Sequence, residues 1–273
     1  MLRCRNSYSF TLIELLVVIV IIGILAGVIM ISTSSSINKA TIAKLKAFEE
    51  SVSNNLAASM VSRWKLDEGS GTIANDAWGS NNGTLVNFNF DANSGWVSEN
   101  DCVSSKCLKF DGVDDYINLG SSITPSLSNG SVSFWRKQLY LDSWLLFRGQ
   151  SSSEYFLATS GGTGNFYHSA NTSGSRVIYK DGLIATAPAI DNNWHYYVIS
   201  GVNLTLWTTL ALNTYGGVWM YDGFLDDLRI YNAPLSASQI KQNYIAGLGA
   251  LLNKGSISKE EYNEKMNVLA SEN

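Results

Sequence analysis

A single carboxylate stands at the entrance of a long apolar run near the start of the chain. Glu14 is followed by uncharged residues from Leu15 to Ile31. An ionised carboxylate inside a membrane segment is costly, and such residues usually mark a function. The carboxylate therefore needs a positive partner. The nearest candidate is the amine that a cut just before Phe10 would create.

The apolar run has the length of a membrane anchor. From Leu15 to Ile31 an α-helix is about 26 Å long, and adding residues 10–13 spans a bilayer core of about 30 Å. Arg3 and Arg5 in the short segment before it fit a basic leader on the cytoplasmic side.

The stretch from Ser9 to Ile19, Ser-Phe-Thr-Leu-Ile-Glu-Leu-Leu-Val-Val-Ile, resembles the N-terminus of type IV pilins and type II secretion pseudopilins. The resemblance implies that a prepilin peptidase cuts between Ser9 and Phe10 and methylates the new amine of Phe10. It also implies that Glu14 pairs with the amine of a neighbouring subunit during filament assembly. The family nearly always has Gly before the cut, whereas this chain has Ser9. An uncleaved signal anchor is the alternative interpretation of this segment.

Composition limits the classes of function. The chain has 273 residues, 45% of them hydrophobic, which allows one sizeable globular domain in addition to the N-terminal helix. Its net charge is −4, and loss of Arg3 and Arg5 with the leader would make it −4 − 2 = −6. An acidic balance lacks the electrostatic footprint of nucleic-acid binding, so no nucleic-acid partner is expected.

Two of the three cysteines would remain in the mature chain. Cys4 lies in the leader, while Cys102 and Cys107 lie in a polar loop. A pair of cysteines in an exported chain predicts a disulfide, with free thiols as the alternative. A metal site would require further ligands near the pair.

Residues 32–60 have the spacing of an amphipathic helix. Apolar or small residues recur every three to four positions, at Ile37, Thr41, Leu45, Phe48, Val52 and Leu56. Since Pro is absent before Pro125, we expect one helix from about Thr11 to about Ser59, hydrophobic over 10–31 and amphipathic over 32–60.

Beyond residue 60 the pattern becomes that of β-strands. Alternating runs such as Val132–Trp135, Arg176–Tyr179, His195–Ser200 and Leu228–Tyr231 are bounded by Gly, Asn, Asp and Ser, which predicts an all-β sandwich. Several motifs in order resemble laminin-G-like, concanavalin A-type jelly rolls: Trp64-Lys-Leu-Asp-Glu-Gly-Ser-Gly-Thr72, Leu108-Lys-Phe-Asp-Gly-Val-Asp-Asp-Tyr-Ile117 and Gly223-Phe-Leu-Asp-Asp-Leu-Arg-Ile-Tyr231. The resemblance covers about 61–246 and implies two stacked antiparallel sheets that bind sugars or proteins.

The last segment, 247–273, predicts a short helical hairpin. Gly255 stands where a first helix would end, and Ser258 with Glu261 forms a capping box for a second. A partly ordered tail is the alternative. The predicted fold class is therefore mainly β: a long N-terminal helix after a leader (1–9), a jelly-roll sandwich and this hairpin.

The jelly-roll resemblance also implies a structural calcium site. Calcium takes carboxylate and carbonyl oxygens as ligands. In related jelly rolls an Asp opening the last strand joins backbone oxygens, which points to Asp226, with Gly130 as a carbonyl donor and Asp67 as a nearby acid. Alternatively, Asp226 and its neighbour Asp227 face solvent or Arg229.

Ligand binding would use aromatic rings on a concave face. Trp144, Trp207, Tyr215 and Trp219 lie in the less patterned stretches and are the candidates, although core packing accounts for them equally well. Trp64, Trp135 and Trp194 lie in strand motifs and are expected in the core. Enzymatic activity is not expected, because the sequence has no Glu-x-Asp-x-Glu-like pattern of the kind found in glycosidases with this fold. His195 lies where the jelly-roll family often has His, which predicts a structural role.

These features together predict a pilin-like subunit. It would be anchored once in the bacterial inner membrane before assembly, joined to other subunits through its helix, and would display a lectin-like domain on a filament or the cell surface to bind a glycan or surface protein. A minor pseudopilin of a type II secretion system and a membrane-anchored lectin that does not polymerise are the alternatives.

Overall fold

The computed structural model describes residues 16, 19–20, 43–44, 47–48, 50–52, 54–98, 101–119, 128–139, 147–148, 155–159, 166–167, 176–185, 191–203, 211–212 and 221–271. The chain divides into two compact units, Met1–Ala47 and Phe48–Asn273. In the first unit the described residues are helical. No helix within the described ranges has both the length and the apolar character needed to cross a membrane. Most of the anchor predicted over 10–31 lies outside these ranges.

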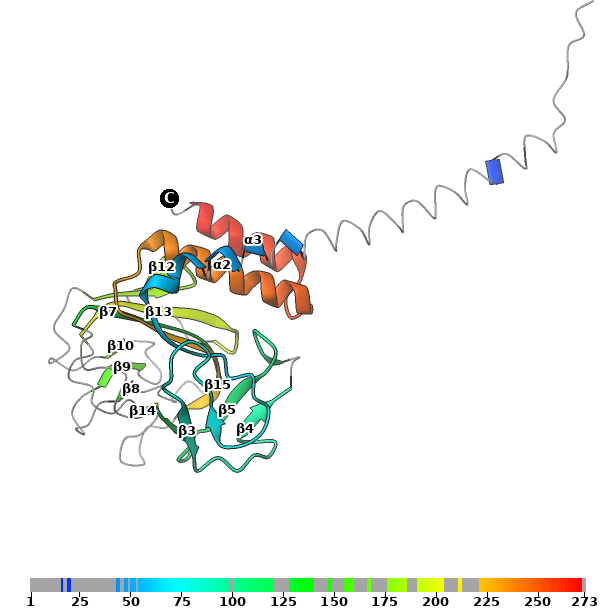
Figure 1. Cartoon of the computed structure of the whole chain (residues 1–273). Helices are drawn as coiled ribbons and strands as arrows, with labels where there is room; N and C mark the ends of the chain where they lie inside the picture. Colours follow the sequence, from blue (N-terminus) through cyan, green and yellow to red (C-terminus); the bar gives the residue numbers. More distant parts are fainter. Residues whose placement is uncertain are drawn as a thin grey trace, which may run out of the picture. The chain divides into compact units, whose positions relative to one another are not determined.

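The second unit is an antiparallel β-sandwich, which confirms the predicted fold class (Figure 1). One sheet has the order β12-β11-β13-β7-β15-β5-β4, and β1 also pairs with β15. Its strands are β1 (Met60–Trp64), β4 (Gly95–Val97), β5 (Cys107–Asp111), β7 (Gly130–Gln138), β11 (Val177–Lys180), β12 (Leu183–Ile184), β13 (His195–Val202) and β15 (Asp222–Tyr231).

The other sheet has the order β10-β9-β8-β14-β6-β3-β2. Its strands are β2 (Ile73–Ala74), β3 (Gly83–Val86), β6 (Tyr116–Asn118), β8 (Phe147–Arg148), β9 (Tyr155–Thr159), β10 (Phe166–Tyr167) and β14 (Ala211–Leu212). All four stretches predicted as strands from their alternating pattern overlap β7, β11, β13 or β15.

The strand-rich region is entered and left through helices. Residues 48, 50–52 and 54–56 are helical, and a 3₁₀ turn η1 (Ala57–Ser59) leads directly into β1, close to the predicted helix end. The C-terminal hairpin consists of α2 (Ala237–Lys254) and α3 (Lys259–Ser271).

The hairpin starts earlier than the predicted boundary at 247, by 247 − 237 = 10 residues. A capping box that the sequence interpretation overlooked starts α2. The Ser236 hydroxyl accepts from the Gln239 N–H, and the Gln239 side chain accepts from the Ser236 N–H. Gly255 ends α2 with a left-handed φ of +74°, as predicted, because a residue without Cβ adopts this conformation at little cost.

The larger sheet is buried on both faces. Between the two sheets, Phe134 of β7 and Tyr197 of β13 belong to one apolar cluster, together with Trp64 of β1. Their neighbours Trp135 and Tyr196 point the other way and belong to a second cluster. That second cluster joins the sheet to the N-terminal helix and the hairpin through Val52, Leu56, Tyr231, Ile240, Tyr244, Leu248, Leu251 and Leu269.

Helix α2 lies very close to the sheet. The ring of Tyr244 stacks on that of Trp135 with centroids 5.7 Å apart. A Cβ on Gly247 would lie only 2.2 Å from an atom of the Trp135 ring, so this position excludes any side chain without a shift of the helix. In Figure 1, α2 and α3 lie side by side over the face formed by β7 and β13.

Candidate functional site

A disulfide-closed loop lies in the connection from β4 to β5, beside the last strand, β15. Cys102 and Cys107 are bonded, as predicted, and both are fully buried. They pack with Phe224 of β15. The disulfide keeps the residues between the two cysteines in a compact turn against β15.

The predicted calcium-ligand candidates Asp67 and Asp226 are brought together by this loop. Asp226 is completely buried, and its Oδ2 accepts hydrogen bonds from the N–H groups of Val103 and Ser104, both at 2.9 Å. The Ser104 hydroxyl lies 3.0 Å from Asp226 Oδ1 and 3.1 Å from Asp67 Oδ1. The N–H of Lys106 donates to Asp67 at 3.0 Å. Burial raises the pKa of Asp226 well above its ordinary value, although the Ser104 N–H opposes the rise.

Gly130, the third predicted ligand, is not part of this group. In the pairing of β15 with β7, Asp226 lies opposite Trp135, while Gly130 pairs with Val202 at the far end of β7. Trp135 lies five positions along β7 from Gly130, which corresponds to about 16 Å. The strand register therefore does not bring Gly130 together with Asp226.

The contacts around Asp67 and Asp226 do not fit a calcium site. Calcium requires six to eight oxygen ligands that point their lone pairs at the ion. Here N–H and O–H donors already bond to both Asp226 oxygens and to Asp67 Oδ1. The nearby carbonyls of Cys102 and Ser104 accept hydrogen bonds from the ammonium group of Lys254 in α2. A calcium ion would have to displace these groups.

A buried ionic network lies next to this loop, centred on Asp227. Its carboxylate accepts from Arg63 Nε at 2.7 Å and from Arg229 Nε at 3.1 Å, and it also contacts Arg229 Nη2. Arg229 Nη1 donates to Asn243 of α2 at 3.1 Å. Burial alone would raise the pKa of Asp227, but Arg229 and Arg63 hold it well below its ordinary value. The network thus ties β1, β15 and α2 together.

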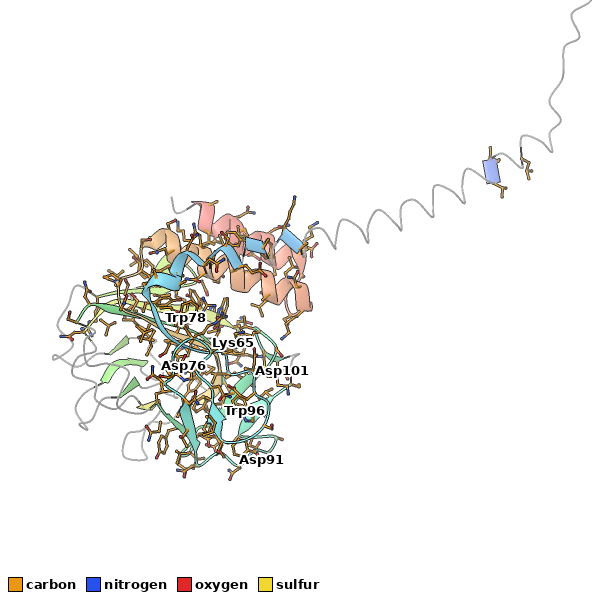
Figure 2. All side chains as sticks on the ribbon, in the orientation of Figure 1. Lys65, Asp76, Trp78, Asp91, Trp96 and Asp101 are labelled. Atoms are coloured by element: carbon orange, nitrogen blue, oxygen red, sulfur yellow. A yellow bond between two sulfur atoms is a disulfide. The ribbon has the colours of Figure 1, made fainter. Side chains whose placement is uncertain are left out.

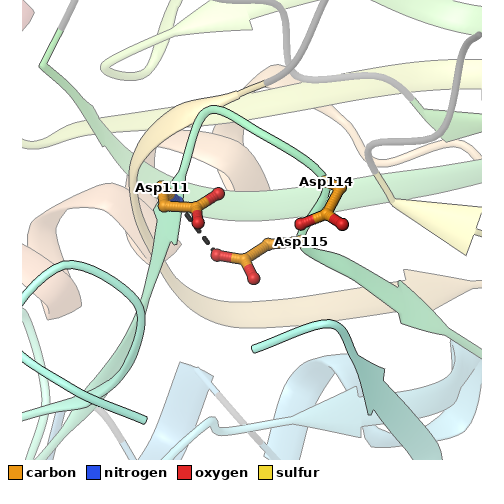
Figure 3. Close-up of side chains that lie close together, drawn as sticks. All are labelled: Asp111, Asp114 and Asp115. Carbon is orange, nitrogen blue, oxygen red and sulfur yellow. Dashed lines mark hydrogen bonds between the residues drawn. The ribbon is translucent and has the colours of Figure 1, made fainter. Parts of the chain in front are cut away.

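Three further carboxylates meet at the end of β5. One oxygen each of Asp111, Asp114 and Asp115 lies within 4.8 Å of the others (Figure 3). Asp115 Oδ2 accepts from the Ser94 hydroxyl at 2.7 Å and from the Asp111 N–H at 2.9 Å. Burial raises the pKa of Asp115 to about 6. The sequence interpretation missed this grouping. The close spacing of the three acids in Asp111-Gly-Val-Asp114-Asp115 was the signal that could have indicated it.

His195 is held between two carboxylates. Its Nδ1 lies 2.5 Å from Asp181 and its Nε2 lies 2.7 Å from Asp191. Both ring nitrogens are thus engaged, which agrees with the predicted structural role. His168 lies outside the described residues.

The aromatic side chains are distributed differently from the prediction. Trp64 and Trp135 are buried, but Trp194 is only partly buried and donates its indole N–H to the Asp101 carbonyl at 2.9 Å. Trp194 was therefore wrongly expected in the core. It precedes β13 rather than lying inside a strand. Trp144, Trp207, Tyr215 and Trp219 lie outside the described residues.

An exposed tryptophan that the sequence interpretation did not select lies on a hydrogen-bonded turn. The side chain of Asp76 accepts from the N–H groups of Arg63, Trp78, Gly79 and Asn81, at 2.9 to 3.1 Å. These four donors lower its pKa against the effect of burial. Trp78, on this turn, is 49% exposed, and Figure 2 labels it together with Asp76. An exposed indole face on such a hydrogen-bonded turn can stack on an apolar or sugar surface.

The N-terminal residues Ser9, Phe10 and Glu14 lie outside the described residues, and sequence comparison bears on them instead. Residues 4–30 match the model of the prokaryotic N-terminal methylation motif. The chain therefore carries this motif. No curated protein matches the sequence.

Several solved structures are similar to the chain. Domain 4 of AbnA, a GH43 extracellular arabinanase from Geobacillus stearothermophilus, in complex with arabinotriose, is 17% identical with a TM-score of 0.48, over 68% of this chain and 98% of that one. Trypanosoma rangeli sialidase in complex with the inhibitor DANA is 11% identical with a TM-score of 0.45, over 74% of this chain and 37% of that one. The botulinum neurotoxin serotype D ligand binding domain in complex with N-acetylneuraminic acid is 14% identical with a TM-score of 0.44, over 72% and 53%.

Proposed function

We propose that the protein is a pilin-like structural subunit of a type IV pilus or related filament that displays its β-sandwich as a binding domain. The observation that carries the proposal is the match of residues 4–30 to the N-terminal methylation motif, the segment that contains Phe10 and Glu14. In this proposal a prepilin peptidase removes 1–9 and methylates Phe10. Glu14 then neutralises the amine of a neighbouring subunit.

The attachment of the helix to the sandwich supports this role. Val52 and Leu56, near the end of the N-terminal helix, are buried in the same cluster as Tyr231 of β15 and Leu248 of α2. In this proposal the apolar segments 10–31 form the core of the assembly and the sandwich is displayed outside it. Before assembly, that segment anchors the subunit in the inner membrane.

The proposed role of the sandwich is binding without catalysis, with a glycan or a surface protein as the ligand. Among the residues that the structure describes, Trp78 can contact such a ligand, because its ring is exposed and Asp76 accepts a hydrogen bond from its N–H. The Trp144, Trp207, Tyr215 and Trp219 side chains remain sequence-based candidates.

Replacing Glu14 with Gln tests the assembly role. A buried amine left without its partner costs about 3–5 kcal/mol, so filament yield should fall by more than about tenfold, while membrane-inserted protein accumulates normally. Glu14→Asp, which keeps the charge, is the matched control and should retain more filaments than Glu14→Gln. Equal filament yields from the parent and Glu14→Gln would refute the role.

Mass analysis of the N-terminus from cells separates the rival functions. The proposal expects a chain that begins with methylated Phe10. An intact segment from Met1 to Ser9 would instead indicate a membrane-anchored lectin. A processed chain that is scarce in purified filaments but required for secretion would indicate a minor pseudopilin.

A further inference from the structure

The disulfide-closed loop presents opposite polarities to two neighbours. Its N–H groups at Val103 and Ser104 point to Asp226, and its N–H at Lys106 points to Asp67. Its carbonyls at Cys102 and Ser104 are the partners of Lys254. The loop therefore lies between the two carboxylates and the ammonium group. Its N–H groups bond to the carboxylates, and its carbonyls bond to the ammonium group.

Lys254 reaches this loop from the last turn of α2. Its Nζ lies 3.0 Å from the Cys102 carbonyl oxygen and also contacts that of Ser104. An ammonium group offers three donors and no acceptor, so backbone carbonyls satisfy it well. Hydrogen bonds from a charged donor are stronger than those between neutral groups.

Carbonyl oxygens beside carboxylates are the ligand set that a calcium ion would use. In this chain the carbonyls bind an ammonium group that belongs to the protein itself. The carboxylates accept from backbone N–H groups, whose hydrogens point at the lone pairs that a metal would need. Gly130, which would have completed the ligand set, lies at the other end of β7.

We propose that the ammonium group of Lys254 takes the place of a metal cation at the Asp67–Asp226 loop, so that the C-terminal hairpin is held to the sandwich by this chain's own charge and not by calcium. This role is independent of filament assembly. Two of the polar contacts of α2 are then Asn243 bonded to Arg229 and Lys254 bonded to the loop. They lie about 16 Å apart along the helix, and the apolar residues Leu248 and Leu251 between them pack on the sheet.

The test is Lys254→Met in the full chain, purified in a neutral detergent. Methionine keeps much of the apolar stem and removes the charge, so the loop carbonyls lose their donor. In excess EDTA we expect the Tm to fall by about 4–8 °C, and amides in α2 and α3 to exchange with deuterium faster than those of β7. Lys259→Met is the control, because Lys259 is exposed on the same hairpin, and its Tm should change by less than about 2 °C.

Calcium titration decides between the ammonium group and a metal. The parent protein should melt at the same temperature in EDTA and in millimolar calcium chloride. A calcium-dependent rise in the Tm of the parent that disappears in Asp226→Ala would overturn the proposal. Unchanged melting and exchange in Lys254→Met would overturn it as well. A calcium-dependent rise seen in Lys254→Met alone would support the proposal strongly, since it would show a metal occupying the vacated position.

Discussion

Replacing Asp227 with Asn should destabilise the sandwich strongly, because Asp227 is the shared partner of two guanidinium groups. The side chains of Asp227, Arg63 and Arg229 are only 12%, 18% and 10% exposed. Asn removes the negative charge and leaves Arg63 and Arg229 close together, with one neutral acceptor between them. Breaking a buried ion pair by removing one partner costs about 3–5 kcal/mol.

The expected size follows from the size of the domain. For domains of about 150–250 residues, each 1 kcal/mol shifts the Tm by about 2–4 °C. The Tm of Asp227→Asn should therefore fall by about 6–20 °C in thermal unfolding of the full chain followed by tryptophan fluorescence. Glu264→Gln removes a carboxylate from the exposed face of α3 and is the matched control, expected to change the Tm by less than about 2 °C.

Two further measurements isolate the charge. Arg63→Met added to Asp227→Asn should cost less than the sum of the single changes, because only one guanidinium then lacks its partner. The pKa of Asp227 is held well below its ordinary value, so its stabilising effect is present above about pH 4 and is lost as the pH falls further. The gap between parent and Asp227→Asn should therefore narrow below about pH 4. Additive single changes, or a gap that is independent of pH, would refute the reasoning.

Two other predictions concern Asp115 and Trp78. Burial raises the pKa of Asp115 to about 6, so the folded protein holds this proton more tightly than the unfolded chain. The resulting stabilisation is greatest below about pH 4 and is lost as the pH rises towards 6. The Tm of Asp115→Asn should therefore rise relative to the Tm of the parent between pH 4 and 7. A Tm difference that stays constant over this range would contradict the prediction. Trp78→Ala should reduce glycan binding on an array by about fivefold or more, given about 1 kcal/mol or more for a stacked ring, while the Tm stays within about 2 °C; unchanged binding would remove Trp78 from the ligand contact.

Local sequence signals predicted the elements well where a few neighbouring residues decide the outcome. The strand pattern of His195–Ser200 matches β13, and Gly255 ends α2 as expected. The start of α2 also has a local signal, the capping box of Ser236 and Gln239, although the sequence interpretation overlooked it. Capping and turn chemistry act over three or four residues, so they can be seen without a fold.

The site depended on contacts that no local pattern specifies. Asp227 and Arg63 are 164 positions apart in sequence, and Asp226 and Val103 are 123 apart. A β-bulge interrupts the pairing of β15 with β7 between Asp226 and Arg229, and Asp227 adopts a left-handed φ of +48° there. Such a bulge re-aims side chains, so the two adjacent acids have different partners. The same register placed Gly130 far from both.

The sequence by itself was enough to predict the N-terminal motif around Glu14, the mainly β fold class and the disulfide between Cys102 and Cys107. Each of these depends on residue type and short-range spacing. Only the tertiary structure decided that Lys254 would meet the loop of Cys102 and that α2 would cover Trp135. Those contacts depend on strand register and on helix packing, which arise when segments more than a hundred residues apart are brought together to bury a common apolar face.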